Sequence, residues 1–362
     1  MDKYWVAHGK LVTPQGVVDG AVQIAHGRIA AMRSTPPRGA RRIDLRGAYL
    51  APGFIDLHVW GDPRIVARQC VKSGTTAFLT TLGPQPPERL AKEVAARAKT
   101  PGILGAQCLG LHLEGPFLNS KRAGALPQRW MRPPTIRELE QLEAIAEERL
   151  RLITLAPELP RALEAIRWCR HQRVIAALGH SDADAPRALE AVDAGASAVT
   201  HVFNGMRPFH HRQPVLLDIA LTESRLTTMV ILDGVHVSPH AFRLLVREKG
   251  SERIALVTDS IRHQGWNVIE RRGAYYTRGG ILAGSDLTMI EAVRNAVLVG
   301  GVSLAEAVRM ATEVPARLLG LGRSRGTLAV GRRADLVAFD RNFRVLLTIV
   351  GGQVGYQRRG WT

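Results

Sequence analysis

Five apolar runs in this chain end at an acidic residue or a histidine, the side-chain types that bind metal ions or move protons. The terminal residues of these runs are Glu114, His180, His201, Asp233 and Asp259. A short buried strand followed at once by a polar residue is how a (β/α)8 barrel presents its reactive groups at one face. One glutamate together with several histidines favours a divalent metal ion at that face.

Glu114, His180 and His201 offer one carboxylate oxygen and two imidazole nitrogens, a set that suits Zn²⁺ or a similar first-row ion. Three protein ligands leave coordination positions open for water and substrate. Asp259 ends the last predicted barrel strand, and its carboxylate could act as a general base. One such residue alone is more often an ordinary hydrogen-bonded side chain, but four at four strand ends predict a catalytic site. His112, two residues before Glu114, either supports the ligands or simply packs in the core.

The elements that would position these residues alternate between strands and helices along the middle of the chain. Strand patterns occur at residues 54–58, 76–80, 109–114, 152–156, 174–180, 196–201, 229–233 and 254–259. Helical patterns lie between several of them, at residues 87–99, 135–148, 161–171 and 185–194. This alternation predicts a parallel sheet, and eight units predict closure into an α/β fold, a (β/α)8 barrel of the TIM type, over residues 51–324.

The two ends of the chain share a different pattern. Residues 1–50 and 325–362 read as short strands separated by turns, such as His26-Gly27 and Gly351-Gly352. Neither segment can bury a core alone. We therefore expect the two ends to form one small β-sandwich domain beside the barrel.

Composition restricts the class of protein. The 362 residues are 46% hydrophobic and 22% charged, as in an ordinary soluble globular protein. No apolar run reaches the roughly 18–20 residues of a membrane helix, and the first residues lack the pattern of a signal peptide. The three isolated cysteines predict no disulfide framework, so we expect a cytoplasmic protein. The net charge of +17 comes from arginines spread along the chain, which predicts no nucleic-acid partner and could attract an anionic small substrate.

Several stretches around the strand ends carry a family resemblance. They are residues 51–58 (APGFIDLH), 110–117 (GLHLEGPF), 178–182 (LGHSD), 200–206 (THVFNGM), 232–236 (LDGVH), 256–259 (LVTD), 282–289 (LAGSDLTM) and 331–337 (GRRADLV). At these residues the chain resembles the amidohydrolase superfamily and, within it, the N-acetylglucosamine-6-phosphate deacetylases. The HLEGP and THxxNxM elements are typical of the deacetylases, whereas PGFIDLH is shared across the superfamily.

The resemblance implies a metal-dependent hydrolysis. Glu114, His180 and His201 would bind one divalent ion, with zinc the first choice and iron, manganese and cobalt the alternatives. A metal-activated water would attack the acetamide carbonyl, and Asp259 would protonate the departing amine. The products would be glucosamine 6-phosphate and acetate, in amino-sugar catabolism.

The resemblance also implies contacts to a phosphorylated amino-sugar substrate. Asn204 and the Gly205 amide would hold the phosphate and sugar, and His236 would be a further substrate contact. Arg212 matches an arginine that reaches a phosphate in the neighbouring subunit's site, which implies a homodimer. Arg212 is also compatible with a surface role in a chain this rich in arginine. Leu287 would line the sugar pocket.

Three positions depart from the family pattern. Trp60 replaces the second histidine of a His-x-His pair, which favours a single metal over two. Leu126 stands where the family commonly has a histidine that polarises the carbonyl, a role that His58 could take over. The segment from Ser260 to Arg278 is shorter than usual. Two alternatives therefore stay open: a related amidohydrolase that acts on another N-acyl amine or a cyclic amide, and a non-catalytic sugar-phosphate-binding homologue.

Overall fold

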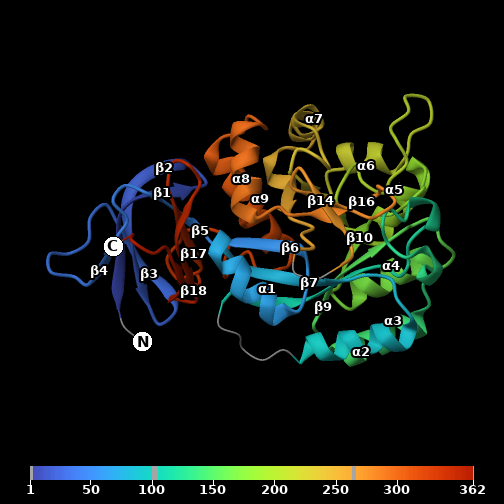
Figure 1. Cartoon of the computed structure of the whole chain (residues 1–362), viewed down its shortest axis with the longest axis horizontal. Coiled ribbons are helices and arrows are strands. Elements are labelled where there is room, and N and C mark those ends of the chain that lie inside the picture. The colour runs from blue at the N-terminus through green and yellow to red at the C-terminus, as the bar shows by residue number, and fades with distance from the viewer. Residues whose placement is uncertain (1–2, 100–104, 263–265, 362) are drawn as a thin grey trace.

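The computed structural model describes residues 3–99, 105–262 and 266–361 (Figure 1). It contains the predicted barrel. Eight strands pair in parallel in the spatial order β13-β12-β11-β10-β9-β8-β7-β6. They are β6 (Phe54–Trp60), β7 (Thr75–Leu82), β8 (Gln107–Glu114), β9 (Leu150–Leu155), β10 (Ile175–Leu178), β11 (Ala198–Val199), β12 (Thr227–Ile231) and β13 (Ile254–Val257).

The first and last barrel strands meet just beyond the end of β13. The Trp60 amide donates to the Ser260 carbonyl at 3.0 Å, and the Asp259 amide donates to the His58 carbonyl at 2.8 Å. A parallel bridge joins Val59 to Ser260. These bonds nearly close the barrel and confirm the predicted fold class.

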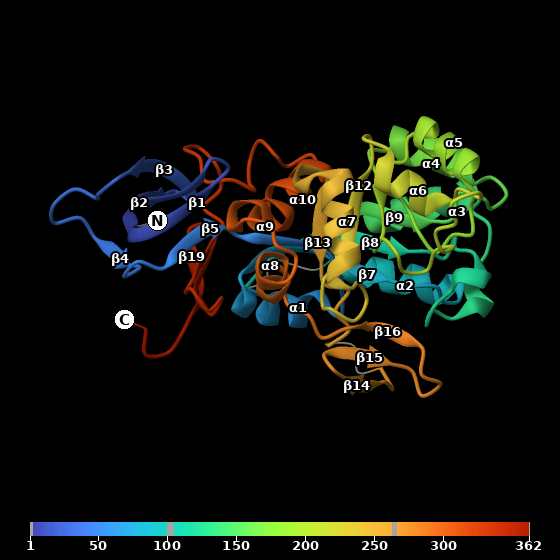
Figure 2. The same cartoon turned by 90° about the horizontal axis from the view of Figure 1, so that it is seen from above.

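Helices connect the strands and surround the barrel in Figures 1 and 2. They are α1 (Pro63–Cys70), α2 (Pro87–Ala98), α3 (Ile136–Ala146), α4 (Ala162–His171), α5 (Ala185–Ala194), α6 (Leu216–Thr222), α7 (Pro239–Lys249), α8 (Met289–Leu298), α9 (Leu304–Ala311) and α10 (Glu313–Leu318). Short 3-10 turns are η1 (Val71–Ser73), η2 (Ser120–Arg122), η3 (Gln128–Trp130) and η4 (Ser251–Arg253).

The local sequence explains where these helices begin and which face they bury. Side chains of Thr135, Asp184 and Ser238 accept hydrogen bonds from the first turns of α3, α5 and α7. In α4 the buried residues are Ala162, Ala165, Ile166 and Cys169, a helical spacing of three and four that packs one face against the barrel.

The two chain ends pair in a second sheet. Its strands are β1 (Tyr4–Thr13), β2 (Gly16–Ala25), β3 (Arg28–Arg33), β4 (Arg42–Asp44), β5 (Tyr49–Pro52), β17 (Leu336–Phe339), β18 (Val345–Val350) and β19 (Gln353–Gln357). The order is β19-β18-β17-β5-β1-β2-β3, with β4 beside β1. The antiparallel pairing of β5 with β17 joins the two ends, and Val6, Val22, Ile24, Leu336 and Ile349 share one apolar cluster. The sheet is continuous, and strands from both chain ends contribute to this core.

A third, small sheet follows the last barrel strand and projects from the barrel in Figure 2. Its antiparallel strands are β14 (Ile269–Arg271), β15 (Ala274–Tyr276) and β16 (Leu282–Ser285). A bridge from Ser260 to Ser285 ties it to the barrel. The sequence had not indicated these strands, because every residue of β14 is exposed and the segment lacks an apolar alternation.

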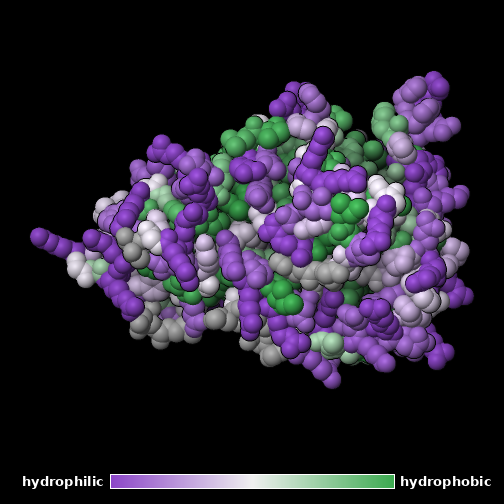
Figure 3. Space-filling model, viewed as in Figure 1, coloured by the Kyte–Doolittle hydropathy of each residue, from purple (hydrophilic) through white to green (hydrophobic). Residues whose placement is uncertain are grey.

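The outer surface is mostly hydrophilic on the face seen in Figure 3. Among the described helices none is long and apolar enough to span a membrane.

Candidate functional site

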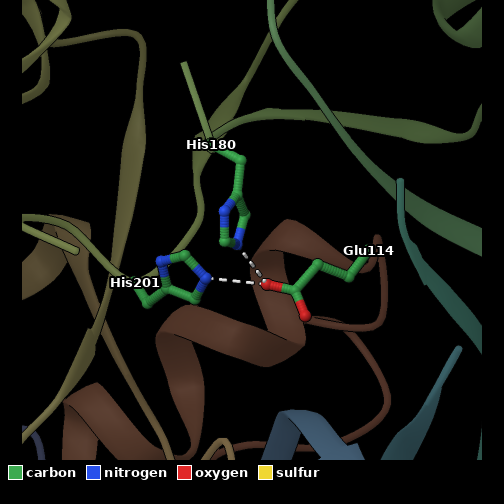
Figure 4. A group of neighbouring side chains, drawn as sticks. All are labelled: Glu114, His180 and His201. Atoms are coloured by element: carbon green, nitrogen blue, oxygen red, sulfur yellow. Dashed lines mark hydrogen bonds and ion pairs between the residues drawn. The ribbon is translucent and has the colours of Figure 1, made fainter. Parts of the chain in front are cut away.

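The predicted metal ligands converge at the C-terminal ends of three barrel strands (Figure 4). Glu114 is the last residue of β8, and His180 and His201 each lie two residues beyond β10 and β11. Glu114 Oε1 is 3.0 Å from His180 Nε2 and 2.7 Å from His201 Nε2. All three side chains are buried, and their ligand atoms lie within 4.8 Å of one another. The geometry therefore brings one carboxylate and two imidazoles around a single point.

The hydrogen bond behind His180 determines which of its nitrogens is free. Its Nδ1 lies 2.7 Å from the Arg122 carbonyl oxygen, which can only accept, so Nδ1 carries a proton and donates. A neutral His180 then directs the Nε2 lone pair at the Glu114 carboxylate. Two lone pairs at 3.0 Å repel unless a cation or a proton lies between them. This donor set fits a divalent metal ion.

The site contains several charged side chains although these side chains are buried. Burial would raise the pKa of Glu114, but the charge of His58 and the hydrogen bonds from the histidines hold it well below its usual value. Burial would lower the pKa of His180, yet Glu114 raises it overall. For His58 the charges of Glu114 and Asp259 outweigh burial and raise the pKa to about 9. The raised pKa values of His58 and His180 reflect the negative charge of Glu114 and Asp259, at the place where a cation would be bound.

The backbone at the site is strained. His180, His201 and Asp259 have φ angles of 46°, 27° and 49°. This left-handed region is uncommon for residues other than glycine and is often found at functional sites. Gly205 has φ 62°, and a Cβ there would come within 2.9 Å of His180 Nδ1. A glycine is therefore required at position 205 for His180 to keep its place.

Asp259 faces the ligands from the end of β13. Its Oδ1 accepts a hydrogen bond of 2.8 Å from the Trp60 indole Nε1 and lies 3.3 Å from His58 Nε2. His58 Nε2 also lies 3.3 Å from Glu114 Oε2. His58, Glu114 and Asp259 thus form a second group of possible ligands that shares Glu114 with the first. Trp60 stands at the position of the missing family histidine. Its indole donates a hydrogen bond to Asp259, where an imidazole would have added a metal ligand.

A cavity of about 230 Å³ opens over these residues. Its lining contains the predicted ligands and Asp259, and also Asn204, Gly205, His236, Trp60 and Leu126. Asp233 orients His236, because its carboxylate accepts from the His236 amide at 2.8 Å and lies 2.6 Å from its Nδ1. Leu126 lies in the wall, so the structure places an apolar side chain where the family resemblance implies a carbonyl-polarising histidine.

Three sequence-predicted residues lie outside this cavity. Leu287 is buried and lines a different cavity, beside Asp56 and Cys70, whereas Leu282 lines the cavity at the metal ligands. The role of Leu287 in the sugar pocket stays a prediction. Arg212 is exposed in the loop between β11 and α6, which projects from the barrel at the upper right of Figure 1. His112 is fully buried: its Nδ1 donates to the Leu57 carbonyl, and its Nε2 lies 2.7 Å from the Thr154 hydroxyl.

Two supporting groups were missed by sequence reasoning. The Arg122 carbonyl orients His180, and the Arg122 side chain is in turn held by Asp182 at 2.7 Å. The ion pairs and hydrogen bonds from Arg207 and Arg122 lower the pKa of Asp182 to about 2. A main-chain carbonyl leaves no signal in the sequence. The Trp60 indole was noted only as a lost ligand, and its donation to Asp259 depends on three-dimensional contact.

Comparisons with known proteins agree along nearly the whole chain. The amidohydrolase family model matches residues 49–355, and the composite domain of allantoinase matches residues 1–36. The chain is 34% identical over 377 residues to the N-acetylglucosamine-6-phosphate deacetylase of Bacillus subtilis, covering 96% of this chain and 95% of that one. It is 36% identical over 371 residues to the N-acetylgalactosamine-6-phosphate deacetylase of Escherichia coli O157:H7, covering 95% and 97%.

Among solved structures, the fold is similar to that of N-acetyl-D-glucosamine-6-phosphate deacetylase from Mycobacterium smegmatis. That structure is of an aspartate-to-alanine mutant in complex with N-acetyl-D-glucosamine-6-phosphate. The TM-score is 0.91 at 32% identity, and the match covers 99% of this chain and 100% of that chain.

Proposed function

Because this chain belongs to the amidohydrolase family, we propose that it hydrolyses N-acetylglucosamine 6-phosphate to glucosamine 6-phosphate and acetate. The observation that carries the proposal is the convergence of Glu114, His180 and His201 on one point, with Asp259 facing them across the cavity. The relatives named above that act on N-acetylated sugar phosphates support the substrate class.

Glu114, His180 and His201 would hold one divalent ion, with zinc the first choice for this ligand set. When bound, the ion would polarise the amide carbonyl and lower the pKa of an attacking water. Trp60 donates to Oδ1 of Asp259, so Oδ2 is the oxygen left to move protons. Asp259 Oδ2 takes a proton from the attacking water and then transfers it to the amine nitrogen as the C–N bond breaks.

The opposite part of the cavity would bind the sugar phosphate. Asn204 and the Gly205 amide lie beyond β11, and His236 lies beyond β12 with its Nδ1 fixed by Asp233. Arg212 is exposed on the loop after β11 and does not line the cavity. A phosphate contact from Arg212 therefore requires a second copy of the chain, and a homodimer is part of this proposal.

Acetate release from N-acetylglucosamine 6-phosphate by the purified, zinc-loaded protein tests the reaction. Asp259→Asn keeps the shape of the side chain but removes the base, so kcat should fall by about 10²–10⁴. Asp193→Asn, an exposed aspartate on α5, is the matched control and should leave kcat unchanged. No acetate release, with turnover of another N-acyl amine or a cyclic amide, would favour the related amidohydrolase instead. Binding of the sugar phosphate without turnover of any amide would favour a non-catalytic homologue.

The phosphate contact has its own test. Arg212→Ala should raise KM for the phosphorylated sugar far more than for unphosphorylated N-acetylglucosamine, and light scattering should give the mass of a dimer. Equal effects on both sugars, or a monomer that retains full activity, would remove the role of Arg212.

A second candidate substrate is the C4 epimer, N-acetylgalactosamine 6-phosphate. The observation that favours it is the 36% identity to a deacetylase of that sugar phosphate. Comparing kcat/KM for the two epimers at equal metal loading decides between them.

The three cysteines are free thiols. Free thiols fit a reducing compartment, so a cytoplasmic location completes the proposal.

A further inference from the structure

A second cavity of about 390 Å³ adjoins the proposed catalytic cavity. Ala125 and Leu126 line both cavities and form the shared wall. Trp60 belongs to the catalytic side, and its ring packs edge-on against Trp266 of the second cavity, with centroids 5.0 Å apart. The second cavity thus borders the catalytic cavity along Ala125 and Leu126.

The wall residue Leu126 has no hydrogen-bonding group on its side chain. It packs beside Gly83, where an added Cβ would come within 2.8 Å of the Trp60 ring and 3.4 Å of Leu126. Gly83 thus lets the end of β7 approach both side chains closely. The apolar lining continues through prolines and tryptophans into the second cavity: Leu82, Pro84, Pro86, Pro127, Trp130 and Trp266.

Part of the lining of this cavity is basic. Arg89, Arg97 and Arg129 line it together with one acid, Glu93. Glu93 lies 3.3 Å from Arg97 and 4.0 Å from Arg89. Arg129 lies 5.4 Å from the centroid of the Trp130 ring and is in no ion pair with the described residues. Arg97 is already bound by Glu93, Thr80 and Thr81, so Arg89 and Arg129 are the cations that favour a negatively charged group beside them.

The strand order places the second cavity on the acyl side of the substrate. It is built from the end of β7 and the loop after β8. The proposed sugar-phosphate contacts come from the ends of β11 and β12, which are four strands away in the barrel and hence across it. An amide carbon held at the metal ligands with its nitrogen toward β11 and β12 must direct its acyl substituent toward β7 and β8.

The loop that forms the cavity is anchored by main-chain hydrogen bonds. The Asn119 amide donates to the His180 carbonyl, the Ala156 amide to Phe117, and the Arg132 amide to Pro116, at 3.0, 2.9 and 3.1 Å. A methyl group is about the size of a water molecule, roughly 30 Å³, so an acetyl group would leave a cavity of about 390 Å³ almost empty. Pre-formed apolar pockets with a few polar groups at fixed positions are typical of ligand sites.

From these observations we propose that the second cavity binds an acyl chain longer than acetyl that ends in a carboxylate. The protein would then hydrolyse N-acyl amino-sugar phosphates that are half-amides of a short dicarboxylic acid. The carbonyl carbon bonds to the oxygen of water, the C–N bond breaks, and one proton passes to the amine, so the products are the amino-sugar phosphate and the dicarboxylic acid. This inference rests on the proposed hydrolysis and names its acyl specificity.

Four synthetic substrates test it with the zinc-loaded protein: the N-acetyl, N-butyryl, N-succinyl and N-(4-aminobutyryl) derivatives of glucosamine 6-phosphate. The kcat/KM for the succinyl substrate should equal or exceed that for the acetyl substrate. The aminobutyryl substrate has a similar length with the opposite charge and should be at least about 10-fold poorer than the succinyl one. Turnover of the acetyl substrate with a fall of about 100-fold for both butyryl and succinyl substrates would overturn the proposal.

A pair of arginine variants tests the charged end. Arg129→Gln should raise KM for the succinyl substrate by about 10-fold and leave the acetyl substrate unchanged. Arg247→Gln, an exposed arginine on α7, should change neither. An unchanged KM for the succinyl substrate in Arg129→Gln would overturn the carboxylate contact.

A binding measurement separates this proposal from the proposed function. If no amide is hydrolysed, the proposed function fails, and the zinc-loaded Asp259→Asn variant then decides by calorimetry. Tighter binding of the succinyl than of the acetyl derivative would support the acyl cavity. Equal or weaker binding of the succinyl derivative would overturn it.

Discussion

The hydrogen bond from Trp60 to Asp259 leads to a prediction about the proton-transfer step. Trp60→Phe removes the indole N–H, which lies 2.8 Å from Asp259 Oδ1, but keeps an aromatic ring against Trp266. Without this bond the carboxylate can rotate and present either oxygen to water. We therefore expect kcat for acetate release to fall.

The expected size of the effect follows from burial. Trp60 is 4% exposed, and the Asp259 side chain is 13% exposed, so water replaces the lost donor poorly. A hydrogen bond to a charged group contributes about 1.5–3 kcal/mol. If the activation free energy rises by this amount, kcat falls about 10- to 150-fold, because each 1.36 kcal/mol is a factor of ten.

The assay is steady-state acetate release by the zinc-loaded variant, with the thermal unfolding temperature measured alongside. Trp168→Phe is the matched control, because the indole nitrogen of Trp168 is buried on α4 without a hydrogen-bond partner among the described residues. That variant should keep wild-type kcat. A Trp60→Phe enzyme with wild-type kcat and a bound metal would refute the positioning of Asp259 by Trp60.

Three further predictions concern the carbonyl, the metal and pH. Leu126→His adds a donor to the cavity wall and should raise kcat for the acetyl substrate by about 10²–10³; a steady-state assay showing no rise would mean that another group already polarises the carbonyl. Removal of the metal by a chelator should abolish acetate release. It should also lower the free energy of unfolding by about 2.7 kcal/mol, compared with protein in free zinc at 100 times its Kd; calorimetry that shows equal stability would contradict a bound ion. Burial, helped by the charge of Glu148, raises the pKa of Glu143 from 4.5 to about 7. The folded state therefore holds a proton that the unfolded state has lost, so this group's stabilising contribution is present below pH 4.5 and is lost as the pH rises to about 7. Glu143→Gln should remove this part of the pH dependence in urea unfolding at pH 5 and pH 8, whereas Glu140→Gln, exposed on the same helix, should keep it.

The barrel could be predicted because its strands are short buried runs with polar residues at their ends. All four residues of β13 are buried, and Asp259 follows two residues later, so the pattern marks both the strand and the catalytic candidate. The same reasoning located His180 and His201. Periodicity and residue type were sufficient here because parallel strands are buried on both faces.

Features that depend on side-chain direction could not be predicted. Leu287 is predicted to line the sugar pocket. Its amide is held by the Ser285 hydroxyl at 3.0 Å where the chain turns toward α8, and its side chain lines a cavity beside Asp56 and Cys70. Leu282, five residues earlier, faces the site. The Arg122 carbonyl and the second cavity are formed by segments that meet only in the folded chain.

The central claim is that one metal ion at Glu114, His180 and His201 drives amide hydrolysis with Asp259 as the base. The most direct test is to titrate the metal-free protein with Zn²⁺ and to measure the initial rate of acetate release from N-acetylglucosamine 6-phosphate at each step. We predict a linear rise that ends at one equivalent per chain, with Asp259→Asn binding the same single equivalent but releasing almost no acetate. A rise that continues to two equivalents, or full activity without metal, would contradict the account.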